Sequence, residues 1–307
     1  MSTTSAIPAA AAPALPLSTR LSARLSDYLE LSKPRIVVLE LIVASAAALI
    51  AAPHSFQFNV LLAALAGTAL VAASASAANH LLERNTDAAM PRTANRPLAA
   101  GRITAAEAIV LSSIGLVAGM TLLLLAVNRL TALLGLASWV LYVVIYTPMK
   151  RRTPQNTTVG AVAGALPLLM GWTATGVPLD LTALSLASVL FLWQFPHFMA
   201  IAWLYRDDYA AGGHKMLTVV DPSGLRAGVL AVVAAALLIP VSLVPALPPT
   251  SGSPWIYAVW ATGLGTVQLL LAVRFAIRRD HPSAKRLLRA TLVFLPAWMA
   301  VLAMVRV

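Results

Sequence analysis

The chain has no cysteine and few charged residues. The missing cysteine excludes disulfide bonds and thiolate metal sites, but it does not indicate a compartment. Charged side chains make up only 11% of the 307 residues, which is less than half the share in a typical soluble domain. The short alternating strands of an outer-membrane barrel are also missing. These absences exclude a soluble enzyme and a porin-like barrel.

Long apolar segments recur along the whole chain, and 59% of its residues are hydrophobic. Each segment has the length of a helix that crosses a bilayer. The sequence therefore predicts an all-α, polytopic membrane helical bundle with nine transmembrane helices. Their expected ranges are 35–52, 58–78, 105–127, 130–147, 157–176, 182–204, 226–248, 254–277 and 287–306.

The basic residues lie between the apolar segments. The net charge of +11 could suggest a nucleic-acid partner, but this distribution instead follows membrane topology, so no nucleic acid is expected. With the N-terminus inside, all of the 22 basic residues except Arg129 and Arg306 fall on the inner side. We therefore expect a multi-pass protein of the bacterial cell inner membrane, with its N-terminus and its active-site loops in the cytoplasm.

Residues 1–27 are rich in Ala, Ser and Pro and lack the apolar core of a signal peptide. We interpret them as a disordered N-terminal tail that precedes a membrane domain over 28–307. The alternative is a short mitochondrial transit peptide, because the segment holds Arg20 and Arg24 and no acid before Asp27. The membrane would then be the mitochondrial inner membrane.

The second apolar segment ends in the polar sequence NHLLERNTDAAMPRTANRPL, residues 79–98. Asn79, Glu83 and Asp87 stand four apart, so on a helix each is turned by about 40° and raised by about 6 Å from the one before. Oxygen ligands suit Mg²⁺, but a column of about 12 Å is too long for one ion held by all three. The spacing favours ions bridged by a diphosphate. The alternative is an ordinary helix end with solvated or paired charges.

Three groups of basic residues accompany this column. Arginine binds phosphate oxygens through a planar two-pronged donor, so each group could hold a phosphorylated substrate. Taken singly, each could also be an inner-face topology anchor. The groups are Arg84, Arg92 and Arg96 beside the column, Lys150 and Arg151 in YTPMKRRTPQN with Tyr146 at its start, and Lys33 and Arg35 in SKPRI.

A second polar stretch, WQFPHFMAIAWLYRDDYAAGGHKML, covers residues 193–217. Asp208, beside Asp207 and Arg206, follows an aromatic helix. His197, one turn after Trp193, could line a pocket for a flat aromatic ligand or act on a proton. It could equally be a residue that packs between helices with its ring nitrogens hydrogen-bonded.

The chain resembles the UbiA-type membrane prenyltransferases, and within them the heme branch that farnesylates protoheme IX. The resemblance covers the chain from about Tyr28 and rests on NHLLERNTDAAMPRTANRPL, YTPMKRRTPQN, GALPLLMGW, LWQFPHF and RDDYAAGGHKML. It implies transfer of a farnesyl group from farnesyl diphosphate to a vinyl group of protoheme IX with addition of water, giving heme O and diphosphate. It also implies Mg²⁺ as cofactor and the lipid bilayer, with a heme A synthase or a terminal oxidase assembly as candidate partners.

The resemblance implies roles for individual residues. It places Asn79, Glu83, Asp87 and Asp208 at the metal and Lys150 with them in catalysis. It places the arginines after the column, the basic loop and His197 at the substrates. The wider family has two acids four apart in the second loop, whereas this chain has Leu204 at the first, so the resemblance implies one protein-bound metal more firmly than two. Pro167-Leu168 replaces a common Pro-Pro pair.

Two other functions remain open from the residues. A quinone-precursor prenyltransferase would keep the family and change the acceptor, although WQFPHF and Glu83 argue against it. A transporter of organic anions would use the polar helix ends as its binding site. Transporters usually place such a site near the midplane, and here the charges gather at one face, which favours an enzyme.

Overall fold

The computed structural model describes residues 17–53, 55, 57–247 and 253–306. In these residues nine helical spans are long and apolar enough to cross a membrane, as the sequence predicts. All regular structure in them is helical. The spans are α2 (Pro34–Ala51), α3 (Phe58–Ala89), α4 (Ala105–Ala126), the continuous rod of α5 (Arg129–Trp139), η1 (Val140–Tyr146) and α6 (Thr147–Met149), then α7 (Asn156–Ala174), α8 (Leu181–Leu204), α11 (Leu225–Leu243), α12 (Pro254–Arg278) and α13 (His281–Arg306).

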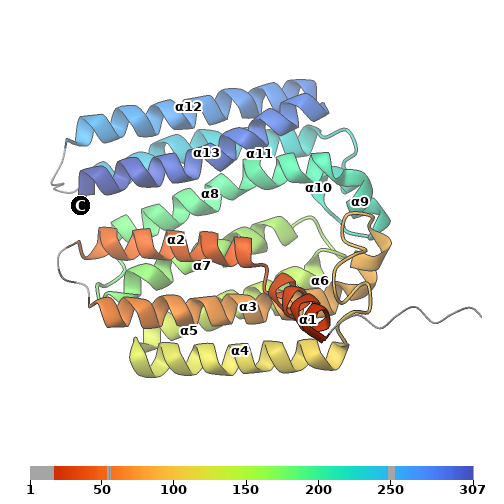
Figure 1. Cartoon of the computed structure of the whole chain (residues 1–307). Coiled ribbons are helices and arrows are strands. Elements are labelled where there is room, and N and C mark those ends of the chain that lie inside the picture. Colours follow the sequence, from red (N-terminus) through yellow and green to blue (C-terminus); the bar gives the residue numbers. More distant parts are fainter. Residues whose placement is uncertain (1–16, 54, 56, 248–252, 307) are drawn as a thin grey trace, which may run out of the picture.

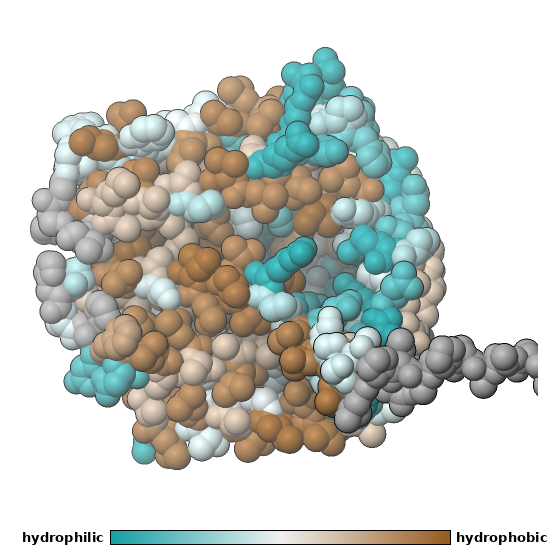
Figure 2. Space-filling view, in the orientation of Figure 1, coloured by the Kyte–Doolittle hydropathy of each residue, from teal (hydrophilic) through white to brown (hydrophobic). Residues whose placement is uncertain are grey.

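One end of the bundle carries the short helices. There α1 (Leu17–Leu31), α9 (Arg206–Ala211) and α10 (Leu217–Val220) lie beside the loops that join the spans (Figure 1), while the 3₁₀ turn η2 (Val244–Ala246) follows α11. In the same orientation the flank of the bundle is largely hydrophobic, and polar residues gather toward the end with α9 and α1 (Figure 2). The chain is thus a multi-pass membrane protein with one strongly polar end.

Helix α1 differs from the expected disordered tail over 1–27. Residues 17–31 are helical, and residues 1–16 lie outside the described residues. Polar contacts hold α1 to the start of α4: the Tyr28 hydroxyl donates to Glu107 at 2.7 Å, and Arg102 lies 2.9 Å from Asp27. Glu107 also completes a capping box with Thr104. The tertiary contacts therefore stabilise a helix that composition alone did not predict.

The core is built where α2, α7, α8 and α13 meet. Its buried members include Trp172, Phe294 and Trp298, which are at most 3% exposed. Small residues let the helices approach closely, because a Cβ on Gly171 would lie only 1.9 Å from the Ala44 carbonyl oxygen of α2. This close contact fixes the position of α2, which begins beside the polar end.

Two local features shape the polar end. Helix α3 continues eleven residues past its predicted end at 78, so the whole Asn–Glu–Asp column is helical. It stops at Met90, which is extended (φ −105°, ψ 121°) because Pro91 follows. The rod between α5 and α6 widens into a π-helix before Pro148, where Thr147 N–H bonds the Tyr142 carbonyl.

Candidate active site

The column of oxygen-bearing side chains lies on a buried face of α3. Asn79, Glu83 and Asp87 are at most 6% exposed. Buried polar side chains are stable only when partners satisfy them. Each member of the column has a basic partner from a different segment of the chain.

Asn79 is bound on both sides of its amide. Lys33 Nζ donates to Asn79 Oδ1 at 2.6 Å and to the Tyr142 hydroxyl at 3.2 Å, and Asn79 Nδ2 donates to Thr147 Oγ1 at 3.1 Å. Burial lowers the pKa of Lys33 to about 7, and the positive charges of Lys150 and nearby Arg96 add to this effect. Three spans therefore meet at this amide.

Glu83 pairs with Lys150, the lysine of the basic loop. Lys150 Nζ lies 2.8 Å from Glu83 Oε1, and it lies 4.7 Å from the ring centre of Tyr146. Burial opposes the lysine charge, but the Glu83 carboxylate outweighs it, so the pKa of Lys150 is raised above its usual value. The Lys150 carbonyl accepts the backbone N–H of Lys215 at 2.5 Å. The basic loop is thereby joined to the segment after α9.

Asp87 pairs with Arg96 in the loop that follows α3. Arg96 Nη1 donates to both carboxylate oxygens at 2.9 Å, and Thr93 Oγ1 donates to the Asp87 carbonyl. Arg92 of the same loop reaches toward the second polar stretch: it lies 3.9 Å from Asp208 and 4.8 Å from the ring centre of Tyr205. The fold thus brings the two polar stretches together.

The arrangement alternates acids and bases around one face of α3. Carboxylate and amide oxygens are ligands that Mg²⁺ prefers, so the donor set fits this ion. In the described part of the chain no three histidine, cysteine or acidic side chains come close enough to hold an ion by themselves. A metal ion at this site would therefore need oxygens from its substrate as well, as the length of the column predicts.

Several other basic residues named from the sequence are not brought into the column. Arg84 and Arg35 are exposed, and Arg84 donates to the Leu81 carbonyl instead. Arg206 lies 3.7 Å from Asp207 and stacks over the Trp203 ring. Arg84 follows Glu83 by one residue, so on α3 it is turned by about 100° away from the face that carries the column.

Arg151 is exposed at the rim of a cavity of about 430 Å³. Glu83, Thr86 and His214 line the same cavity. His214 is 2% exposed, and burial lowers its pKa. The cavity therefore extends the polar site from the column toward the second loop, and it places Arg151 within reach of a ligand there.

Trp193 and His197 face α13. Trp193 Nε1 donates to the Thr291 carbonyl at 2.7 Å, the His197 Nδ1 lies 2.9 Å from Thr291 Oγ1, and the two rings are stacked. This arrangement favours the packing alternative for His197, and neither side chain is among the lining residues of the apolar pocket between the helices. The pocket-facing side chains of α8 are Gln194 and Phe198, one residue later and about 100° around the helix.

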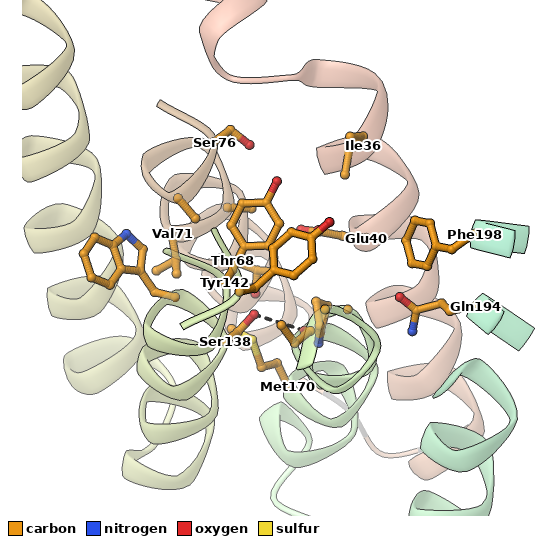
Figure 3. A pocket seen from close by; sticks show the side chains of 18 residues that line it. Ile36, Glu40, Thr68, Val71, Ser76, Ser138, Tyr142, Met170, Gln194 and Phe198 are labelled. Atoms are coloured by element: carbon orange, nitrogen blue, oxygen red, sulfur yellow. Dashed lines mark hydrogen bonds between the residues drawn. The ribbon is translucent and has the colours of Figure 1, made fainter. Parts of the chain in front are cut away.

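An apolar pocket lies next to the column, on the side away from the polar end of the bundle. Its volume is about 270 Å³, and its lining includes Ser76, one turn before Asn79, and the Tyr142 and Tyr146 rings from η1. Figure 3 shows Glu40 pointing from α2 into this space near Tyr142. A cavity with a charged mouth and apolar walls can hold an amphiphile whose head is anionic.

The site also contains residues that the sequence analysis did not name. Tyr142 precedes the named Tyr146 by one helical turn, so periodicity could have found it. Glu40 is an acid within an apolar span, which is by itself a functional signal. Thr147 and His214 lie within the quoted stretches YTPMKRRTPQN and RDDYAAGGHKML, but their spacing did not single them out, because their roles depend on contacts between distant segments.

The chain matches known proteins over most of its length. The model of the UbiA prenyltransferase family matches residues 41–300. The protoheme IX farnesyltransferase of Rhodopirellula baltica is 42% identical over 283 residues, covering 89% of this chain and 98% of that protein. The mitochondrial protoheme IX farnesyltransferase of Homo sapiens is 38% identical over 266 residues, covering 87% of this chain and 59% of that protein.

Solved structures share the fold at low sequence identity. A digeranylgeranylglyceryl phosphate synthase superposes with a TM-score of 0.74 at 16% identity, covering 92% of this chain and 98% of that one. A UbiA homologue from Archaeoglobus fulgidus bound to GPP and Mg²⁺ gives 0.67 at 16% identity, covering 90% and 99%. The nine apolar spans and the shared fold confirm the predicted bundle. The family match and the curated relatives confirm the enzyme interpretation, so the transporter is set aside. The chain belongs to the UbiA prenyltransferase family.

Proposed function

We propose that this chain transfers the farnesyl group of farnesyl diphosphate to a vinyl group of protoheme IX with addition of water, giving heme O and diphosphate. The observation that carries the proposal is a column of paired acids and bases set directly above an apolar pocket. Curated relatives about 40% identical over nearly their whole length are protoheme IX farnesyltransferases.

The basic residues of the column bind the diphosphate. Lys33, Lys150 and Arg96 each hold a member of the column, and all three can turn to phosphate oxygens when the anion arrives. Arg92 lies between Asp208 and the Tyr205 ring, so it links the loop after α3 to the second polar stretch beside the diphosphate. These cations stabilise the negative charge that develops on the leaving diphosphate.

Asn79, Glu83 and Asp87, with Asp208 across the site, are the residues that would hold Mg²⁺. Bound there, the ion neutralises diphosphate charge and makes it a better leaving group. When Lys150 and Arg96 turn to the phosphates, the Glu83 and Asp87 carboxylates would become available as oxygen ligands. Exchange of partners in this way keeps each buried charge compensated throughout binding.

The apolar walls of the pocket keep bulk water away from the reacting allylic carbon. Val71, Met170 and Phe198 supply apolar walls, and the Tyr142 and Tyr146 rings cover the upper part near the diphosphate. A dry pocket protects an allylic cation from premature hydrolysis, while the electron-rich vinyl group approaches as the acceptor. The farnesyl chain and the porphyrin both partition into lipid, which explains a site at a membrane surface.

The polar end of the bundle faces the cytoplasm in this proposal, and the membrane is the bacterial inner membrane. The concentration of basic residues at that end supports this orientation. Product leaves through the bilayer, so a membrane-bound heme A synthase or a terminal oxidase assembly is the proposed recipient.

Incubation of membranes with labelled farnesyl diphosphate and either protoheme IX or 4-hydroxybenzoate tests the function. We expect label to enter a hydroxyfarnesylated porphyrin and not the phenol. Cells that lack the protein should also yield no heme O on pigment extraction. Label in the phenol alone would assign the chain to quinone-precursor synthesis instead.

A further inference from the structure

Glu40 is an acid in the interior of a membrane span, and neither the metal nor the diphosphate of the proposed reaction involves it. It sits in the apolar segment IVVLELIV of α2 and lines the apolar pocket. Among the described residues it makes no hydrogen bond or ion pair with any side chain or backbone group. An unpaired carboxyl group at this depth is costly to bury, so its presence indicates a function.

Glu40 lies close to the place where the reaction is proposed to occur. It follows Lys33, which holds Asn79 at the mouth, by seven residues, so it lies roughly 10 Å deeper along α2. Ile36, one turn above it, and Ser76, one turn from Asn79 on α3, line the same pocket. Glu40 therefore faces the space just below the diphosphate, where the bond between the prenyl chain and its acceptor forms.

Other polar groups of the pocket cannot take a proton at neutral pH. The Tyr142 hydroxyl already accepts from Lys33, and a tyrosine hydroxyl at this pH is itself protonated. The Gln194 amide is not basic, and its Nε2 donates to the Ala161 carbonyl at 2.9 Å. In the described part of the chain Glu40 is the only acid that lines this pocket.

We infer that Glu40 binds the water that adds to the farnesylated vinyl group and accepts its proton. The inference rests on the proposed function. Once the vinyl carbon has bonded to the farnesyl chain, its neighbour beside the porphyrin ring carries the positive charge. The water oxygen bonds to that carbon, one O–H bond breaks, and its proton goes to the Glu40 carboxylate. The diphosphate has already left with its electron pair, so charge and atoms balance.

The inference predicts a particular side product. Without a carboxylate to hold the water and take its proton, the cation instead loses a C–H proton from the adjacent carbon to the released diphosphate. The product is then an alkenyl porphyrin that is lighter than the hydroxylated product by one water. The ratio of the two products thus reports on Glu40 separately from the rate of diphosphate release.

The test is Glu40→Gln, which keeps the size and removes the basic oxygen. Purified variants in detergent are incubated with protoheme IX, farnesyl diphosphate and Mg²⁺, and porphyrins are separated and weighed by mass spectrometry while diphosphate is measured in parallel. We expect diphosphate release to continue and the ratio of hydroxylated to alkenyl product to fall by roughly 10²-fold. Glu40→Asp should keep the hydroxylated product dominant at a lower rate.

Two further variants complete the experiment. Glu40→Leu suits an apolar span, so it provides the same test if the amide impairs folding. Glu30→Gln removes an acid of α1 that is half-exposed and lies 3.9 Å from Arg102, and it should leave the product ratio unchanged. An unchanged ratio in Glu40→Gln and Glu40→Leu overturns the inference, as does loss of diphosphate release in both. If the wild-type protein makes no farnesylated porphyrin, the proposed function itself has failed.

Discussion

At the residue scale, the site is a set of exchangeable charge pairs. Each member of the α3 column is held by a base from another segment, so none of the three is a free ligand as the structure stands. Removing one partner of a buried pair leaves the other uncompensated, which is more costly than removing both. Substitutions in the column should therefore be isosteric, so that loss of function can be separated from loss of folding.

The adjacent acids of the second loop give a matched pair of variants. Asp208→Asn should lower farnesyl transfer by on the order of 10²-fold, since it removes a charged group that faces Arg92 and the proposed metal. Asp207→Asn should leave transfer unchanged, because the Asp207 side chain is 98% exposed. Heme O formation in membrane fractions measures both. Equal losses in the two variants would contradict a specific role for Asp208.

Metal removal tests the column as a whole. Treatment of the purified protein with a divalent chelator should abolish transfer, and added Mg²⁺ should restore it, because the oxygen donors of the column suit a hard cation. An Asp87→Asn variant should need more Mg²⁺ for half-maximal rate than the wild type. Full activity in the chelator would remove the metal from the proposal.

At the element scale, close helix contacts position the site. Helix α2 carries Lys33 at its start and Glu40 in its interior, and it is held against α7 where Gly171 meets Ala44. The π-helical stretch of the rod likewise turns Tyr142 and Tyr146 toward the pocket. Small residues and a local change of helix type thus determine which side chains reach the ligand.

Gly171→Ala should therefore destabilise the protein by about 1–3 kcal/mol, because the new Cβ would collide with backbone that cannot rotate away. Gly263→Ala in α12 is the control: a Cβ there meets nothing within 4 Å, and alanine is the better helix former. Thermal unfolding in detergent compares the two. A midpoint for Gly171→Ala at or above that of Gly263→Ala would show that α2 and α7 can separate freely.

At the scale of the whole molecule, polarity is divided between the ends of the bundle. The acid–base column, the loops that close on it and most basic residues share one end, while the flank is apolar (Figure 2). In the proposed orientation, which follows the positive-inside rule, that end faces the cytoplasm. The absence of cysteine makes the orientation directly measurable, since any introduced thiol is the only one present.

Two single-cysteine variants measure it. Ala100→Cys lies in the exposed loop after α3, and Leu179→Cys lies in the exposed turn between α7 and α8. A membrane-impermeant maleimide should label Leu179→Cys in cells with a permeabilised outer membrane and label Ala100→Cys only after the inner membrane is opened. The reverse pattern would place the diphosphate site outside.

The sequence by itself determined the membrane bundle, its nine spans and the polar column, because hydrophobic length and helical spacing are local properties of the chain. It could not determine which base holds which acid, since Lys33, Lys150 and Arg96 reach α3 only through tertiary packing. Nor could it separate the faces of α8, where Gln194 and Phe198 line the pocket and His197 contacts α13. A rotation of about 100° per residue decides between those faces, and only the packing of neighbouring helices fixes that rotation.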